Sequence, residues 1–221
     1  MITLTKAQVF KYKSIEDSSP VEIADDVTVL VGKNESGKTA FLEALHKALP
    51  LGKTKFDFVF DYPRKDYVRY RPQHDAKTYA NVVELTFRIE KELAEKINKE
   101  VFNGTQVIQP GHSFTRTTNY GNESSVGLGL DQAAALAALK KPLGGIEHTE
   151  EVFAGAKRLD SVVEKIEAKK LEPDSTLAAF AKEWRDRFAK GSSGWGLIDW
   201  HVWNTYLSGS LPRFLYFDDY G

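Results

Sequence analysis

Residues 32–39 read Gly32-Lys33-Asn34-Glu35-Ser36-Gly37-Lys38-Thr39. This octet matches the pattern G-x-x-x-x-G-K-[ST] without a mismatch. The spacing has a mechanical reason, because the loop must wrap a phosphate group so that successive backbone N–H groups point inward. Glycines at positions 32 and 37 permit the backbone angles and the close approach that this wrapping needs. The octet therefore predicts a phosphate-binding loop.

The segments on both sides of the octet support that prediction. Residues 27–31, which read VTVLV, are mostly β-branched and predict a short strand buried on both faces. Residues 38–49 predict a helix, because apolar side chains recur there at one-turn spacing: Phe41, Leu42, Leu45, Ala48 and Leu49. A helix that begins near Lys38 directs its positive N-terminus at the same anion as the loop.

The pattern also assigns roles within the loop. We expect Lys38 to bridge the β- and γ-phosphates of a nucleotide, and the hydroxyl of Thr39 to ligate Mg²⁺. ATP and Mg²⁺ are therefore the expected ligands. The predicted contacts in this stretch are Gly32, Lys33, Asn34, Glu35, Ser36, Gly37, Lys38, Thr39 and Ala40.

Strand and helix patterns continue beyond the loop. Residues 83–89 alternate strictly between apolar and polar side chains, which predicts a half-solvated strand of an antiparallel sheet. Residues 106–108 and 113–118 flank Pro110-Gly111 and suggest a hairpin. Residues 214–217, which read FLYF, resemble a strand. After about residue 130 helical patterns dominate, at 132–139, 156–170, 175–190 and 197–207.

Composition restricts the class of protein. Lys and Arg number 30 against 31 for Asp and Glu among 221 residues, so any nucleic-acid contact must come from a local patch. The absence of cysteine excludes disulfides and thiolate zinc sites. No apolar run approaches the ~20 residues of a membrane helix, and the N-terminus lacks the apolar core of a signal peptide. We therefore expect a soluble, cytoplasmic protein.

The runs VFKYKSIED, VEI and VTVLVGKNESGKTAFLEAL together resemble the N-terminus of ABC-type ATPases of the SMC and DNA-repair group. The NESGKT version of the loop and the segment DYPRKDY are similar to the OLD family (overcoming lysogenization defect). FLYFDDY resembles the strand by which such a chain re-enters its ATPase lobe. The resemblance covers residues 2–90 well and is vague in the helical part.

The resemblance implies an α/β fold, a P-loop NTPase of ABC type with an antiparallel β part and a helical insertion. Residues 1–130 would form the N-terminal part of the ATPase domain, 131–210 the insertion, and 211–221 the returning strand. Lys13 would reach toward the ribose or the γ-phosphate, and Asn34 takes the loop asparagine position. In that family two ATPase lobes sandwich the nucleotide, as a homodimer or with a second lobe, and a C-terminal Toprim nuclease can follow.

Several elements of that family have no clear counterpart here. The family has a glutamine, called the Q-loop glutamine, after its first helix. Gln73 is the nearest glutamine at that place in this chain, but it sits in a charged stretch. LSGS resembles the signature motif of the family, whose serine opens a helix that must end before the strand bearing the catalytic acids. Ser208 precedes Asp218 by only 10 residues, too few for that helix and strand. We therefore interpret LSGS as a helix C-terminal turn. Asp218 and Asp219 are weak candidates for catalytic acids at a strand end. We therefore expect a chain that binds ATP without appreciable turnover.

The most basic stretch, residues 63–72, carries Arg64, Lys65, Arg69 and Arg71 among tyrosines. Such a mixture can hold phosphates and stack bases, as in DNA binding. The alternative, which we favour, is a solvated loop whose charges serve solubility or pair with nearby acids. The five histidines are scattered without metal-ligand spacing, so no metal site is predicted among them.

The leading hypothesis is an ATP-binding segment of an OLD-like, DNA-associated ATPase of bacterial defence or repair, in which the ATP state gates a nuclease or effector part. A non-catalytic module that binds nucleotide and assembles with partners is the alternative. A small P-loop kinase is a third possibility, against which the antiparallel strands argue. A GTPase is disfavoured, because Thr54-Lys55-Phe56-Asp57 precedes the D-x-x-G match at residues 218–221, and the order should be reversed.

Overall fold

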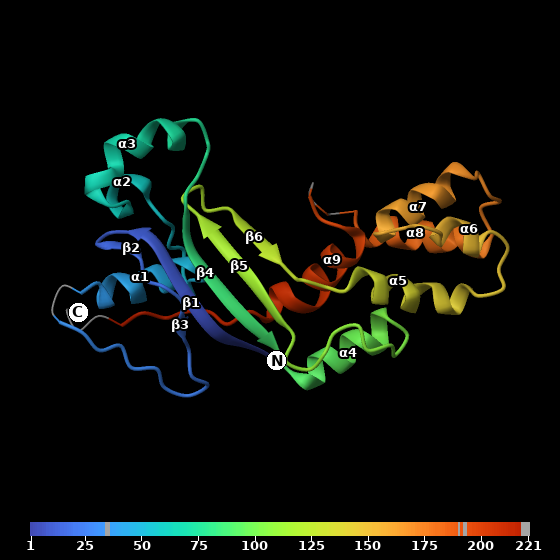
Figure 1. Ribbon diagram of the computed structural model, residues 1–221, viewed down its shortest axis with the longest axis horizontal. Helices are drawn as coiled ribbons and strands as arrows, with labels where there is room; N and C mark the ends of the chain where they lie inside the picture. The colour runs from blue at the N-terminus through green and yellow to red at the C-terminus, as the bar shows by residue number, and fades with distance from the viewer. Residues whose placement is uncertain (34–35, 190, 192–193, 218–221) are drawn as a thin grey trace. The chain divides into compact units, whose positions relative to one another are not determined.

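The computed structural model describes residues 1–33, 36–189, 191 and 194–217. The chain divides into two compact units (Figure 1). The sheet unit comprises residues 2–88, 113–127 and the described residues from 211 onward. The helical unit comprises residues 1, 89–112 and 128–210. None of the described helices is long and apolar enough to cross a membrane.

The sheet contains six strands among the described residues, in the order β2-β1-β4-β5-β6, with β3 also paired to β1. Both β2 and β3 run antiparallel to β1, and β5 runs antiparallel to β4 and β6. The strands are β1 (Ile2–Tyr12), β2 (Ile15–Asp17), β3 (Val21–Glu22), β4 (Asn81–Ile89), β5 (Ser113–Asn119) and β6 (Ser124–Gly127).

The strict alternation at 83–89 folds as predicted. Its apolar members are buried in β4, which pairs antiparallel with β5, and Phe87 stacks on Phe114 of β5 at 5.3 Å between ring centroids. The turn at Tyr120-Gly121-Asn122 then returns the chain into β6, because the side chain of Asn119 accepts hydrogen bonds from the N–H groups of Gly121 and Glu123. A Cβ on Gly121 would lie 2.4 Å from the ring of Tyr79, so glycine is required there.

The hairpin predicted around Pro110-Gly111 is wrong. Residues 106–108 form no strand, because the buried side chain of Asn98 takes up their backbone groups instead. Its amide oxygen accepts from the N–H groups of Val107 and Ile108 at 3.0 and 2.9 Å, and its amide nitrogen donates to the carbonyl of Ile108 at 2.7 Å. A side chain with both donor and acceptor thus replaces the partner strand.

Helix α1 (Lys38–Ala48) confirms the helix predicted after the octet, and it buries Phe41, Ala44 and Leu45. Two further helices follow, α2 (Phe58–Asp61) and α3 (Arg64–Asp75). The carboxylate of Asp57 caps α2 by accepting from the N–H groups of Val59 and Phe60.

The basic stretch 63–72 was interpreted as a loop, and that interpretation is wrong, because most of it lies in α3. Although the stretch is polar, aromatic and imidazole rings recur along it at helical spacing. Tyr67 and His74 stack on Phe58 at 4.9 and 4.0 Å between centroids, and Tyr70 stacks on Tyr62 at 4.9 Å. These aromatic contacts hold a helix that has no fully buried side chain.

The strand predicted at residues 27–31 does not form. Among the described residues no strand pairs with this segment, and Val27, Val29 and Val31 are 71%, 72% and 87% exposed. A β-branched run becomes a strand only when a neighbouring strand takes up its backbone hydrogen bonds. Residues 214–217 likewise form no strand, and Phe214 makes a single parallel bridge with Pro50.

The helical unit confirms the four helices predicted after residue 130, and adds α4 and α6. Its helices are α4 (Lys91–Val101), α5 (Gln132–Lys140), α6 (Thr149–Phe153), α7 (Leu159–Ala168), α8 (Thr176–Arg187) and α9 (Leu197–Val202). The helix of α9 continues through Trp203–Leu207 into a 3₁₀ turn at Ser208–Ser210, in agreement with LSGS as a C-terminal turn. The apolar faces of α7, α8 and α9 supply much of the core, including Val162, Trp184 and Val202.

A buried carboxylate joins three parts of the sheet unit. The side chain of Asp61 is 3% exposed, and Lys47 of α1 donates to both of its oxygens at 2.8 and 2.7 Å. The N–H of Asp57 donates to the same carboxylate at 2.8 Å. The main-chain carbonyl of Asp61 accepts from the N–H of Lys13 at 2.6 Å. One residue therefore ties α1, α2 and the β1–β2 turn together.

We expect Asp61→Ala to lower the free energy of unfolding by about 3 kcal/mol, because it leaves Lys47 charged and partly buried without its partner. The matched control is Asp75→Ala, which removes an exposed partner of Arg71 on α3 and is expected to cost less than about 0.5 kcal/mol. Urea unfolding of the two variants measures the difference. Equal midpoints would contradict the anchoring role of Asp61.

The helical unit contains a half-buried imidazole, that of His201, which makes the stability of the unit depend on pH. Burial, with a smaller contribution from the charge of Arg187, lowers the pKa of His201 from 6.5 to about 4. Because the folded state disfavours protonation, the stabilisation is fully present above pH 6.5 and is lost as the pH falls toward 4. We expect a loss of up to about 2 kcal/mol over this window, measured by urea unfolding, and a flatter profile in His201→Gln. The same pH dependence of the unfolding free energy in wild type and His201→Gln would contradict a role for His201.

Candidate functional site

The N-terminus of α1 and the β1–β2 turn meet at Gly37. Gly37 has φ +89°, a left-handed conformation, and directly precedes α1. A Cβ at this position would lie 3.1 Å from Cγ1 of Ile15 and 3.5 Å from Oγ of Ser14. Glycine is therefore required both by the backbone angle and by the close approach of the turn. At the other end of the loop, a Cβ on Gly32 would lie 2.8 Å from Oγ of Ser36.

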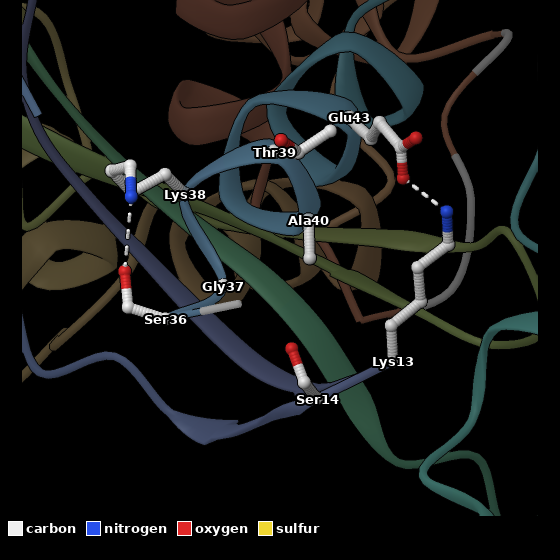
Figure 2. A pocket seen from close by; sticks show the side chains of 8 residues that line it. All are labelled: Lys13, Ser14, Ser36, Gly37, Lys38, Thr39, Ala40 and Glu43. Carbon is white, nitrogen blue, oxygen red and sulfur yellow. Dashed lines mark hydrogen bonds and ion pairs between the residues drawn. The ribbon is translucent and has the colours of Figure 1, made fainter. Parts of the chain in front are cut away.

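The side chain of Lys38 reaches back across the loop. Its ammonium donates to the main-chain carbonyls of Gly32 and Lys33, both at 2.8 Å, and to Oγ of Ser36 at 3.4 Å, the bond drawn in Figure 2. The first turn of α1 carries no acidic residue and no side-chain cap. The backbone N–H groups that begin the helix are therefore available to an anion, beside a fixed ammonium group.

A pocket of about 550 Å³ lies at this helix start. Figure 2 shows its lining, which comes from the β1–β2 turn, the loop and the first turns of α1: Lys13, Ser14, Ser36, Gly37, Lys38, Thr39, Ala40 and Glu43. The pocket has two ammonium groups, two serine hydroxyls and a threonine hydroxyl against one carboxylate. This set of side chains suits a phosphorylated ligand.

The turn between β1 and β2 places Lys13 in the pocket. Tyr12 pairs with Ile15, so Lys13 and Ser14 are the two turn residues, and Lys13 has φ +50°. The side chain of Lys13 forms an ion pair with Glu43 of α1 (Figure 2). The structure thus brings Lys13, expected at the site from the resemblance alone, together with Lys38 and Thr39.

The side chain of Tyr12 is buried next to this pair, with its ring centroid 5.6 Å from the ammonium of Lys13. Its hydroxyl is buried and forms no hydrogen bond within the described part of the chain. Burial, with the carboxylates of Asp61 and Glu43 nearby, raises the pKa of Tyr12. Tyr12 therefore remains a neutral phenol, and the lysines rather than the tyrosine balance these carboxylates, Lys13 at Glu43 and Lys47 at Asp61.

Sequence reasoning missed two lining residues, Ser14 and Glu43. Glu43 follows Thr39 by one helical turn, so helical periodicity from the loop offered a signal for it. Ser14 offered none, because only the β1–β2 turn brings it to the loop. Of the residues predicted for the loop, Lys33 contributes its carbonyl to Lys38, whereas Asn34 and Glu35 lie outside the described residues.

The other candidate residues that the structure describes do not line this pocket. Gln73 is exposed on α3, as are Arg64, Lys65, Arg69 and Arg71. The candidate acids Asp218 and Asp219 lie outside the described residues.

The pocket fits a magnesium nucleotide better than a free metal ion. Within the described ranges no three His, Cys, Asp or Glu side chains are grouped to hold a metal. Mg²⁺ in proteins is commonly held by one or two side chains together with substrate phosphates. The hydroxyl of Thr39, which lines the pocket beside the helix start, is the ligand that this chain would contribute.

A match to a known protein family agrees with these features. Residues 8–177 match a family described as an AAA domain, which is more than half of the chain. A solved structure from work on ATP-driven dimerization and DNA-stimulated activation of SMC ATPases has 14% sequence identity and a TM-score of 0.32, and the match covers 81% of this chain and 99% of that chain. No curated protein matches the chain significantly. Because the match over residues 8–177 includes the octet and covers more than half of the chain, the chain belongs to the AAA domain family. It is an α/β P-loop ATPase domain with antiparallel strands.

Proposed function

We propose that the sheet unit binds ATP with Mg²⁺ at the N-terminus of α1. One observation carries the proposal: Lys38, Lys13, the hydroxyl of Thr39 and the start of α1, which has no side-chain cap, line one pocket. All four can donate hydrogen bonds and two of them are cationic, and they come from the β1–β2 turn and from the start of α1. Phosphate groups are the ligand class that such a set recognises.

Each residue has a physical role in this proposal. The ammonium of Lys38, already directed into the loop by two carbonyls, would turn to the β- and γ-phosphates. Thr39 would ligate the magnesium ion, which neutralises phosphate charge when bound. Gly37 lets the helix start and the β1–β2 turn approach closely enough for Lys13 to face the same phosphates.

Binding should exceed turnover in this chain. Among the described lining residues, Glu43 is the one carboxylate, and it is engaged in an ion pair with Lys13. ATP hydrolysis needs a group that orients the attacking water. The finer role, an OLD-like, DNA-associated ATPase of bacterial defence or repair, rests on the resemblance of residues 2–90 and is part of the proposal.

Replacing Lys38 tests the site. We expect Lys38→Ala to weaken Mg-ATP binding by about 2–4 kcal/mol, because a charge-assisted contact in a partly enclosed site is lost. Isothermal titration calorimetry measures the affinity. Lys53→Ala, which removes an exposed lysine beyond the end of α1, is the matched control and should bind as wild type does. Equal affinity in Lys38→Ala and wild type would refute the site.

A phosphate-release assay separates the ATPase from the alternatives. We expect tight Mg-ATP binding with little release of phosphate. Sustained hydrolysis that disappears in Asp219→Asn would contradict this and would make Asp218 and Asp219 the catalytic acids. Transfer of phosphate to a small acceptor would instead support a P-loop kinase.

The structure gives less support to DNA binding by the basic side chains of α3 than to nucleotide binding at α1. Lys65 pairs with Glu16 at 2.9 Å, Arg69 with Asp66 at 2.9 Å, and Arg71 with Asp75 at 3.6 Å. DNA would have to displace three carboxylates, so we propose that these charges serve solubility. The test is fluorescence anisotropy with duplex DNA at two salt concentrations, comparing wild type with a variant in which the four basic residues are alanine. We expect no difference, and a steep salt dependence seen only in wild type would contradict us.

A further inference from the structure

The ion pair between Lys13 and Glu43 lies inside the pocket proposed for ATP. Both side chains line the pocket, and they are 42% and 25% exposed. Figure 2 shows them facing each other from the β1–β2 turn and from α1. The pair is thus placed where the phosphates of a nucleotide would lie, and the inference below rests on the proposed ATP site.

The position of the turn does not depend on this pair. The main chain of Lys13 is held by its N–H bond to the carbonyl of Asp61 at 2.6 Å and by the pairing of Tyr12 with Ile15. Ser14 and Ile15 also contact the position of Gly37. The four-carbon stem of Lys13 can therefore turn from Glu43 to another anion while the backbone stays in place.

Glu43 brings negative charge to a site that must accept negative charge. It follows Thr39 by one turn of α1, so its carboxylate faces the same pocket as the predicted magnesium ligand. A nucleoside triphosphate is repelled by that carboxylate and also needs the ammonium group that the carboxylate holds. Lys38 differs, because the groups that hold its ammonium in the described loop are carbonyls and a hydroxyl.

We propose that Glu43 is an internal competitor for the nucleotide: it holds Lys13 away from the phosphates, and its charge lowers the affinity for ATP. Binding then requires Lys13 to exchange a carboxylate for a phosphate. Glu43 acts through Lys13 and through its charge, so it is a positioning residue rather than a catalytic one. The affinity of the site is set below what its two lysines would otherwise give.

The proposal predicts opposite effects for the two partners. Isothermal titration calorimetry with Mg-ATP on the full chain should show roughly two- to fivefold tighter binding for Glu43→Gln, the range expected for a partly exposed ion pair. Lys13→Met should bind more weakly than wild type. The double variant should lie between the two single variants, because it lacks both the contact and the repulsion.

The matched control is Glu22→Gln. It breaks an exposed ion pair at 2.6 Å between Glu22 of β3 and Lys6 of β1, and neither residue lines the pocket. It should bind Mg-ATP as wild type does. Unchanged or weaker binding in Glu43→Gln, with an unchanged urea midpoint, would overturn the competitor role, and so would an equal gain in Glu22→Gln. If Glu43→Gln unfolds, weaker binding in the double variant than in Lys13→Met overturns it equally.

The Lys38→Ala variant separates loss of the ATP site from loss of the competitor role of Glu43. If wild type binds Mg-ATP no better than Lys38→Ala does, the ATP site itself is wrong and the competitor role falls with it. If wild type binds and Lys38→Ala does not, the site stands, and the Glu43→Gln result alone decides the role of Glu43.

Discussion

The bonds to Asp61 are the contacts on which the geometry of the sheet unit depends. Its carboxylate holds Lys47 near the end of α1, and its carbonyl holds the N–H of Lys13 in the β1–β2 turn. A carboxylate that is 3% exposed is costly to bury unless it is paired and fully hydrogen-bonded, and here Lys47 and the N–H of Asp57 supply those bonds. The hydroxyl of Tyr120 also donates to the carbonyl of Lys11, which adds a second tie to the same end of β1.

These ties explain how the fold produces the pocket. The β1–β2 turn and α1 come from separate parts of the chain, yet Ser14 and Ile15 lie against Gly37 at the start of α1. The left-handed backbone at Gly37 and the positive φ of Lys13 turn both segments toward the same space. The result is a helix start without a side-chain cap, with Lys13 and Lys38 beside it, a local arrangement of positive charge in a chain whose formal net charge is −1.

Local patterns predicted part of this structure. The bounds of α1 and the alternation of β4 follow from spacing within a few residues, and both are confirmed. The strand expected at residues 27–31 failed because strand formation depends on a partner strand, which sequence spacing cannot specify. Helix α3 was missed because Tyr67, Tyr70 and His74 are held by rings from α2 and its flank. In the site, the octet alone predicts the loop. The positions of Ser14 and Glu43 in the pocket depend on the folded β1–β2 turn, which brings them together at the start of α1.

Hydrogen–deuterium exchange with and without Mg-ATP tests most directly whether the start of α1 and the β1–β2 turn form one nucleotide site. We expect slower exchange at the amides of residues 37–41 and 12–15. The start of α1 would face the phosphates, and Ser14 and Ile15 lie against Gly37. We expect no change in α7 and α8 of the helical unit. Slower exchange confined to the helical unit, or unchanged exchange at residues 37–41 under saturating Mg-ATP, would contradict this expectation.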